Sequence, residues 1–278
     1  MISIFINPLA GKGKAMKAAA MLEELLEEKK LPFTVYTSDW PDNLDQCREA
    51  WIVGGDGTLN YFINKYRNIQ IPIAIFKAGT GNDMAWKLFG DISLTEQAAL
   101  VLAAAPKPVD AALCNGQLFL NVTGIGFDGE VVQSMRMIRR MGDHLGYLWV
   151  VLRKIFSFRE YHFMIHAGNK KWNGRFLLVN IANAARTGGG FLIAPKAAIN
   201  DGKLDLVLCK PLPIFKRLRY LPQIEKGKHL HLPFIIHELV ETVSIEAEKE
   251  LFAHADGELI RAKKFELKIL PGYFSFKY

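Results

Sequence analysis

The chain has 278 residues, half of them hydrophobic, and a formal net charge of +7 at pH 7. This length allows two domains with a substantial core, whereas no uninterrupted apolar run is long enough to cross a bilayer, which argues against spanning helices. The three cysteines, Cys47, Cys114 and Cys209, are too few and too widely spaced for a disulfide scaffold or a zinc site, and they favour a cytoplasmic location.

The first predicted strand, Ile2–Ile6, runs into a polar loop that begins with Asn7-Pro8 and ends with Gly11-Lys12-Gly13-Lys14. The loop lacks the G-x-x-x-x-G-K-[ST] spacing of a P-loop, which argues against Walker-type chemistry. The segment Ala15–Lys30 follows with one apolar face and glutamates opposite, the pattern of a scaffold helix.

The most informative loop is Gly54-Gly55-Asp56-Gly57-Thr58, which separates an apolar strand end from the helix-competent segment Leu59–Lys65. Glycines let bare N–H groups approach an anion, and a helix N-terminus adds donors and a partial positive charge. Asp56 can orient a metal-bound water or an incoming hydroxyl. A glycine-rich turn with an Asp cap is the alternative, but five specified residues after a strand favour phosphate binding and a nucleotide-dependent enzyme.

A third loop follows the predicted strand Ile71–Phe76 and reads Lys77-Ala78-Gly79-Thr80-Gly81-Asn82-Asp83. Three such strand–loop–helix junctions should lie at the carboxyl edge of one parallel sheet, where open α/β folds bind ligands. We therefore predict an α/β nucleotide-binding domain over residues 1–112.

From Leu113 onward strand patterns dominate, and they predict a mainly antiparallel β-sandwich over residues 113–278. The expected strands are Gln117–Thr123, His162–Ala167, Arg175–Asn183, Lys203–Cys209, Thr242–Ala247 and Phe265–Leu270, with a hairpin turn at Asn169-Lys170-Lys171.

Basic residues gather beside apolar and aromatic ones in two amphipathic segments, 135–156, which includes Arg136, Arg139 and Arg140, and 213–221. Such segments suit an anionic membrane surface, although ordinary helices with a solvated basic face would show the same pattern. No nucleic-acid-binding motif accompanies the positive charge, so nucleic acid is not an expected partner.

An ordered set of motifs resembles the diacylglycerol kinase catalytic-domain family, in particular its soluble bacterial lipid kinases, which are also similar to sphingosine and ceramide kinases. The set comprises Asn7-Pro8, Gly54–Asn60, Gly79–Asp83, Gly124–Asp128, Ala194-Pro195 with Asn200–Asp205, and Asp256-Gly257-Glu258. The glycine core alone is shared with NAD kinases. Two departures stand out: Tyr61 occupies the usual place of a Glu, and Lys77-Ala78 replaces Pro-Leu, so that Lys77 could help to bind a triphosphate.

The resemblance implies an NAD kinase/diacylglycerol kinase-like fold with the active site in the cleft between the domains. It implies ATP and Mg²⁺ as cofactors, Asp256 as the base that takes the acceptor proton, and Glu258 as its partner. The resemblance implies a phosphate cradle formed by Gly54, Gly55, Gly57, Thr58 and Asn60, with Asn7 and Thr80 nearby and with Ser38 contacting the nucleotide. It also implies a structural Mg²⁺ bound by Asp201 and by the main-chain carbonyls of Ala198 and Lys203. A simple Asp-Gly turn at a strand end is the alternative for Asp256-Gly257-Glu258, and a type I′ turn would explain Asn200-Asp201-Gly202 equally well.

The expected function is transfer of the ATP γ-phosphate to a lipid hydroxyl, with diacylglycerol and phosphatidic acid as the favoured substrate and product. The alternatives are another lipid, such as a sphingoid base or ceramide, a soluble substrate as in NAD kinases, or a catalytically silent lipid-binding protein. The enzyme is expected to be cytoplasmic and peripherally associated with an anionic membrane, and a homodimer is left open.

Overall fold

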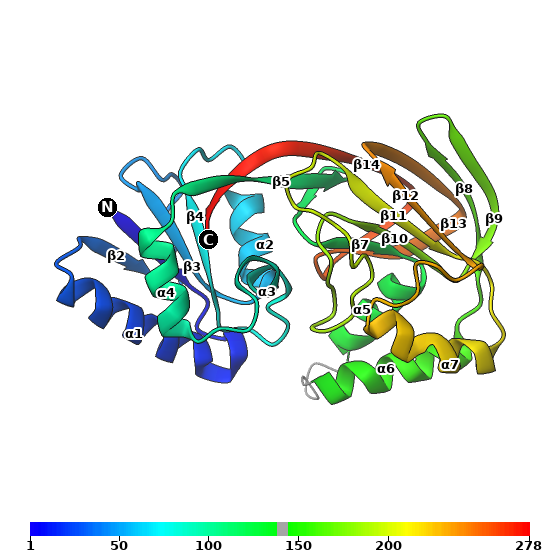
Figure 1. Cartoon of the computed structure of the whole chain (residues 1–278), viewed down its shortest axis with the longest axis horizontal. Helices are drawn as coiled ribbons and strands as arrows, with labels where there is room; N and C mark the ends of the chain where they lie inside the picture. The colour runs from blue at the N-terminus through cyan, green and yellow to red at the C-terminus, as the bar shows by residue number, and fades with distance from the viewer. Residues whose placement is uncertain (138–143) are drawn as a thin grey trace. The chain divides into compact units, whose positions relative to one another are not determined.

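The structure, a computed structural model, describes residues 1–137 and 144–278 (Figure 1). The chain forms two compact units, Met1–Val109 with Gly272–Tyr278, and Asp110–Pro271. The expected division after residue 112 assigned the whole C-terminal part to the second domain. The last segment instead returns to the first unit, because the end of strand β14 (Glu258–Lys277) pairs with β4 at Phe276 and Ile73.

The first unit is built on a parallel sheet with the order β2-β1-β3-β4. Its strands are β1 (Ile2–Ile6), β2 (Phe33–Tyr36), β3 (Glu49–Gly54) and β4 (Ile73–Lys77). Its helices are the short η1 (Ala10–Gly13), then α1 (Lys14–Glu28), α2 (Asp56–Lys65), α3 (Asp83–Phe89) and α4 (Leu94–Ala103).

Alternation along β1 explains how helices cover both faces of this sheet. Ile4 and Ile6 pack in one cluster with residues of α1 and α4, whereas the ring of Phe5 lies 5.0 Å from that of Phe62 on α2. Buried strands with period-two alternation between two helical layers are what a parallel α/β sheet requires. The predicted class of the N-terminal domain is confirmed.

The second unit is a mainly antiparallel β-sandwich, as predicted. Its strands are β5 (Pro106–Cys114), which begins in the first unit, β6 (Gln117–Phe119), β7 (Val122–Ile125), β8 (Tyr161–Ala167), β9 (Lys170–Phe176), β10 (Leu178–Ala182), β11 (Leu204–Cys209), β12 (Ile235–Val240), β13 (Thr242–Ala255) and most of β14. The order β12-β11-β10-β7-β13-β14 is antiparallel throughout, and β8 and β9 extend it beside β13.

Three helices cover one outer face of the sandwich: α5 (Phe127–Met137), α6 (His144–Ser157) and α7 (Ile214–Glu225). They share an apolar cluster with β10 and β11 that includes Val131, Val151, Ile155 and Ile224, and α6 and α7 lie against each other (Figure 1). Arg139 and Arg140, predicted to face a membrane, lie outside the described residues, as does the side chain of Arg136. Across the described part of the chain, no helix combines the length and hydropathy needed to span a membrane.

Several expected strands are interrupted or shifted. The predicted strand Gln117–Thr123 is two strands, β6 and β7, because the N–H groups between them turn to bind Asp256 instead of a neighbouring strand. The hairpin turn expected at Asn169-Lys170-Lys171 is Gly168-Asn169, since Ala167 pairs directly with Lys170.

Candidate functional site

Three loops of the first unit meet at the carboxyl edge of its sheet, at 7–13 after β1, 54–58 after β3 and 78–83 after β4. We call them the phosphate-loop edge. A Cβ on Gly55 would lie 2.9 Å from the Cα of Gly79, and a Cβ on Gly79 would collide with Gly55 in turn. A Cβ on Gly54 would collide with the side chain of Thr58. Gly55 and Gly79 are therefore required because backbone packs directly against backbone, and Gly54 because its backbone packs against the side chain of Thr58.

Helix α2 begins at this edge with Gly55 as its N-cap in extended conformation. The N–H groups of Asp56 and Gly57 have no hydrogen-bond partner among the described residues, and Gly57 is exposed with nothing within 4 Å of a Cβ placed on it. Free N–H groups at the positive end of a helix dipole form an anion site. The local geometry thus suits a phosphate, as the motif predicts.

Asp56 has a structural role at the phosphate-loop edge. Its two carboxylate oxygens accept hydrogen bonds from the N–H groups of Asp83 and Met84, each at 3.0 Å. They cap the N-terminus of α3 and tie the second loop to the third. These contacts do not test the prediction that Asp56 orients a water or a hydroxyl.

Most of the polar side chains expected in the phosphate cradle point into the protein. Asn7 donates from Nδ2 to Oγ1 of Thr58 at 3.3 Å, and its Oδ1 accepts from the N–H of Leu9 at 3.1 Å. Thr58 and Asn60 are only 5% and 2% exposed, and Oδ1 of Asn60 accepts from Asn64. Asn7 and Thr58 therefore fix the shape of the loops, and Asn60 is buried within the helix.

Other predicted nucleotide contacts remain at the surface. Ser38 follows β2, whose carboxyl end is at the same sheet edge, and both Ser38 and Thr80 are exposed. The Nζ of Lys77 lies 3.7 Å from a carboxylate oxygen of exposed Asp91, a surface ion pair that holds the side chain only weakly.

A second group of predicted site residues forms the hairpin turn between β13 and β14. Ala255 pairs with Glu258, and Asp256 and Gly257 between them have φ values of 49° and 86°, as a two-residue type I′ turn requires. The Asp256 carboxylate accepts the N–H groups of Leu120 at 2.7 Å, Asn121 at 2.9 Å and Val122 at 3.0 Å. A carboxylate has about four lone-pair positions, so most of its capacity serves to hold the β6–β7 junction.

The neighbours of Asp256 differ from it in exposure. Glu258 is exposed at the first position of β14. His254 is buried, which lowers its pKa to about 4, and its Nδ1 accepts the N–H of Gly257 at 3.3 Å. A neutral His254 therefore helps to shape the turn from which Glu258 extends.

The predicted metal residues lie in the loop before β11. Asp201 is exposed and its Oδ1 accepts the N–H of Lys203 at 3.0 Å, while Nζ of Lys203 pairs with Glu241 at 2.5 Å. Oxygen donors of this kind suit Mg²⁺ in chemical type. However, no cluster of three His, Cys, Asp or Glu side chains that could hold a metal occurs in the described ranges, so Asp201 would need main-chain carbonyls as co-ligands.

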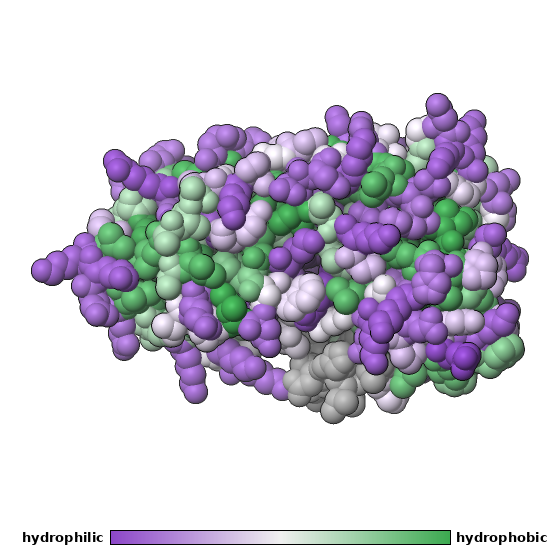
Figure 2. All heavy atoms as spheres, viewed as in Figure 1, coloured by the Kyte–Doolittle hydropathy of each residue, from purple (hydrophilic) through white to green (hydrophobic). Residues whose placement is uncertain are grey.

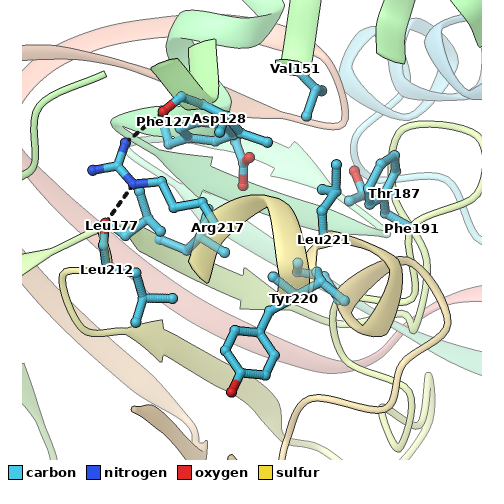
Figure 3. Close-up of a pocket in the computed structure, with 14 residues that line it drawn as sticks. Phe127, Asp128, Val151, Leu177, Thr187, Phe191, Leu212, Arg217, Tyr220 and Leu221 are labelled. Atoms are coloured by element: carbon cyan, nitrogen blue, oxygen red, sulfur yellow. Dashed lines mark hydrogen bonds between the residues drawn. The ribbon is translucent and has the colours of Figure 1, made fainter. Parts of the chain in front are cut away.

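A pocket of the second unit lies between the sandwich and helices α5, α6 and α7 (Figure 3). Its cavity volume is about 60 Å³, and it is partly open to solvent. Its lining is mostly aliphatic and aromatic: Phe127, Val151, Ile155, Leu177, Leu178, Phe191, Ile193, Leu212, Tyr220, Leu221 and Ile224, with Asp128, Thr187 and Arg217 as polar members. This lining is that of a site for an apolar group.

Two charged residues stand out in this apolar lining. Burial raises the pKa of Asp128 to about 6, although the nearby side-chain amide of Asn180 opposes the shift. Arg217, 9% exposed, donates to the carbonyls of Leu212, Ile155 and Phe158 at 2.8–3.0 Å and pairs with Glu160 at 2.6 Å. Arg217 thus fixes α7 to the end of α6, whereas Asp128 points its carboxyl group into the pocket (Figure 3).

The sequence motifs give no role to these pocket residues. Asp128 stands in the Gly124–Asp128 motif and could have been singled out as a carboxyl group at the end of a buried strand. The apolar lining comes from separate elements, and its residues are indistinguishable in sequence from ordinary core.

Comparison with known proteins agrees with both units. Residues 1–114 match the family model described as the diacylglycerol kinase catalytic domain, and residues 121–276 match the YegS C-terminal NAD kinase beta sandwich-like domain. A protein of Shewanella frigidimarina named "Probable lipid kinase YegS-like" is 30% identical over 84% of this chain and 77% of its own length. A diacylglycerol kinase of Mycobacterium tuberculosis is 27% identical over 97% of this chain and 92% of its own.

A crystal structure of a diacylglycerol kinase from Bacillus anthracis superposes with a TM-score of 0.81, at 24% identity over 100% of this chain and 96% of that one. The matched family domains and the relatives identify a phosphotransferase. The chain belongs to the diacylglycerol kinase catalytic-domain family and is an ATP-dependent lipid kinase.

Proposed function

We propose that this kinase phosphorylates the free hydroxyl of diacylglycerol to give phosphatidic acid. The observation that carries the proposal is the apolar pocket of the second unit, which offers alkyl chains a place out of water within a chain of this family. The Mycobacterium tuberculosis and Bacillus subtilis relatives, named diacylglycerol kinases, match 97% and 92% of the chain. A soluble substrate would gain little from such an apolar lining.

One observation favours a second candidate, a sphingoid base. The carboxyl group of Asp128 lies in the otherwise apolar pocket and, with a pKa of about 6, is mostly ionised at neutral pH. An ammonium group beside the alkyl chain would neutralise that charge, whereas diacylglycerol could only donate a hydrogen bond from its hydroxyl.

A lipid panel separates these candidates. The purified chain is supplied with radiolabelled ATP and with diacylglycerol, monoacylglycerol, ceramide or a sphingoid base in mixed micelles. Labelled phosphatidic acid as the main product is the expected result. Preference for the sphingoid base would select the second candidate, and labelling of no lipid would contradict the proposal.

We assign the role of general base to Glu258 rather than to Asp256. Three N–H groups occupy the carboxylate of Asp256 and fix its direction, while Glu258 is exposed beside it. Asp256 then acts as a positioning residue that joins the turn to the β6–β7 junction. An active site in the cleft between the domains stays a prediction.

Mg²⁺ supplies charge neutralisation for the phosphates when it is bound. We propose that the cation of the predicted structural site is held by Asp201 with main-chain carbonyls of Ala198 and Lys203, since these are the hard oxygen donors that Mg²⁺ prefers. Asp201→Ala should raise the Mg²⁺ concentration needed to increase the melting temperature. An unchanged dependence on Mg²⁺ would remove Asp201 from the ligand set.

We propose further that α6 and α7 form the face that meets an anionic membrane. Their exposed apolar residues are Trp149, Phe156, Ile214, Phe215 and Leu218, with exposed fractions from 36% to 67%. Exposed Arg153, Lys216 and Arg219 alternate with them, and hydrophobic and hydrophilic residues lie side by side over this region (Figure 2). The inner sides of the same helices line the pocket, so a lipid at this face would be adjacent to its binding site.

Vesicle binding tests the membrane face. The double change Trp149→Ser and Phe215→Ser should weaken sedimentation with phosphatidylserine-containing vesicles, because apolar area and basic charge act together at such a surface. Leu239→Ser, a similarly exposed residue at 57% on β12, serves as the control. Equal losses in both proteins would show that the α6–α7 face has no special part in binding.

A further inference from the structure

An aromatic pair stands beside the phosphate-loop edge of the first unit. Tyr61 on α2 is 58% exposed, and its ring centroid lies 5.2 Å from that of Trp40 with an interplanar angle of 59°. Both rings are large apolar surfaces, and leaving Tyr61 mostly in water forgoes the stabilisation that burial would bring. An exposed aromatic ring beside a candidate ligand site offers a face on which a flat ligand can stack.

The pair is rigidly connected to the core. The ring of Trp40 lies 5.2 Å from that of Phe5 on β1 and 6.0 Å from that of Phe62 on α2, both in edge-on contact. Phe5 and Phe62 are completely buried. Trp40 and Tyr61 therefore form the outer end of an aromatic cluster that begins in the buried core beside the sheet.

The loop that carries Trp40 is also fixed by hydrogen bonds from α2. Nζ of Lys65 donates to the carbonyl of Trp40 at 2.8 Å, and the hydroxyl of Tyr66 donates to the carbonyl of Pro41 at 2.5 Å. Burial raises the pKa of Tyr66 to about 12, so this hydroxyl keeps its proton at neutral pH. A surface held in this way loses little freedom when a flat ligand stacks on it.

The position of Tyr61 relates it to the phosphate-binding N–H groups. Gly57, whose N–H is available at the start of α2, stands four residues before Tyr61, so the two share one face of the helix about 6 Å apart along its axis. Helical side chains lean toward the N-terminus, which directs the Tyr61 ring toward the phosphate-loop edge. Exposed Ser38 belongs to the same loop as Trp40.

We infer that Trp40 and Tyr61 form a stacking platform for the base of the nucleotide whose phosphates bind the N–H groups of Asp56 and Gly57. The inference rests on the nucleotide-binding role proposed for this edge. A base stacked on Tyr61 would lie about one helical turn from the N–H groups that bind the phosphates. The tyrosine that replaces the usual Glu thereby supplies an aromatic face in place of a charge.

Calorimetric titration of the full chain with ADP and, separately, with inorganic tripolyphosphate tests the platform. Stacking on one aromatic side chain is lost in Tyr61→Ala, which should weaken ADP binding about 10- to 100-fold. Tripolyphosphate has no base, so its affinity should not change. Tyr61→Phe keeps the ring and should bind ADP like the wild type, and Leu100→Ala, a half-exposed residue on α4, is the control for a surface truncation.

Three outcomes would overturn the inference. Wild-type ADP affinity in Tyr61→Ala refutes the platform while leaving the kinase assignment intact. Equal losses for ADP and tripolyphosphate would place the effect of Tyr61 in the phosphate loops. No ADP binding by the wild-type chain would refute the nucleotide role of this edge and the platform with it.

Discussion

The two units differ in what builds their candidate binding surfaces. At the phosphate-loop edge the main chain does so, with Gly55 against Gly79 and free N–H groups at the start of α2. In the second unit side chains line an apolar pocket from several helices, strands and loops. An anion can be bound by backbone alone, because every residue except proline carries an N–H, whereas an alkyl chain needs apolar side chains.

The units nevertheless use an aspartate in the same way. Asp56 caps α3 and Asp256 holds the β6–β7 junction, each by accepting N–H groups from a segment distant in sequence. A motif aspartate can therefore be essential for shape without touching the reacting atoms. Variants in both units test this point and the contrast between backbone and side-chain recognition.

The largest expected effect is at the turn of the second unit. If Glu258 takes the acceptor proton, Glu258→Gln should lower turnover by about 10²- to 10⁴-fold with unchanged ADP affinity and melting temperature. Asp256→Asn should instead lower the melting temperature, because its amide nitrogen cannot accept the N–H groups that the carboxylate accepts. A stable Asp256→Asn protein without turnover, beside an active Glu258→Gln protein, would return the role of base to Asp256.

A smaller effect is expected from the pH dependence of the second unit. The pKa of Asp128 rises from its ordinary value of 3.8 in the unfolded chain to about 6 in the folded chain, so the folded chain keeps this proton to a higher pH. The free energy of unfolding therefore falls by about 3 kcal/mol as pH rises through that window. His254, with a pKa lowered from 6.5 to about 4, acts in the opposite direction, because the unfolded chain binds its proton first as pH falls.

The two titrations therefore oppose each other between pH 4 and pH 6. Asp128→Asn should be more stable than the wild type at pH 7 and should lose stability steeply on acidification, as measured by urea unfolding at several pH values. Parallel stability curves for the variant and the wild type would show that Asp128 does not titrate in this window.

The smallest of the three effects concerns the backbone contact in the first unit. A side chain at Gly55 meets the backbone of Gly79 at 2.9 Å, and overpacking of this kind costs about 1–3 kcal/mol of stability. Gly55→Val should thus lower both the melting temperature and the ADP affinity. Gly57→Ala, which meets nothing within 4 Å, should leave the melting temperature unchanged or slightly raised. A Gly55→Val protein with normal ADP binding would contradict the backbone account.

The same contrast explains how much could be predicted from the sequence. Backbone recognition needs glycines at fixed places after strands, so the pattern of Gly54, Gly55 and Gly57 is enough to predict the loop and the parallel sheet behind it. The lining of the pocket, such as Val151 and Leu212, has no such mark, because apolar residues look alike whether they line a cavity or fill a core.

Pairing between residues far apart in the sequence also could not be predicted. The return of β14 to β4 depends on a single register between Phe276 and Ile73, far apart in sequence. The inward direction of Thr58 and Asn60 and the occupied carboxylates of Asp56 and Asp256 also depend on partners outside the motifs themselves. A motif shows which residues are present at a site but not which atoms remain available.

Hydrogen exchange of the full-length chain, followed by mass spectrometry, tests the division of binding between the units most directly. ADP should slow amide exchange in segments 7–13, 54–61 and 78–84 of the first unit, and a short-chain diacylglycerol should slow it in α6 and α7 of the second. Protection of α6 and α7 by ADP, with no change at Asp56 and Gly57, would contradict the assignment of the nucleotide phosphates to the backbone of the first unit.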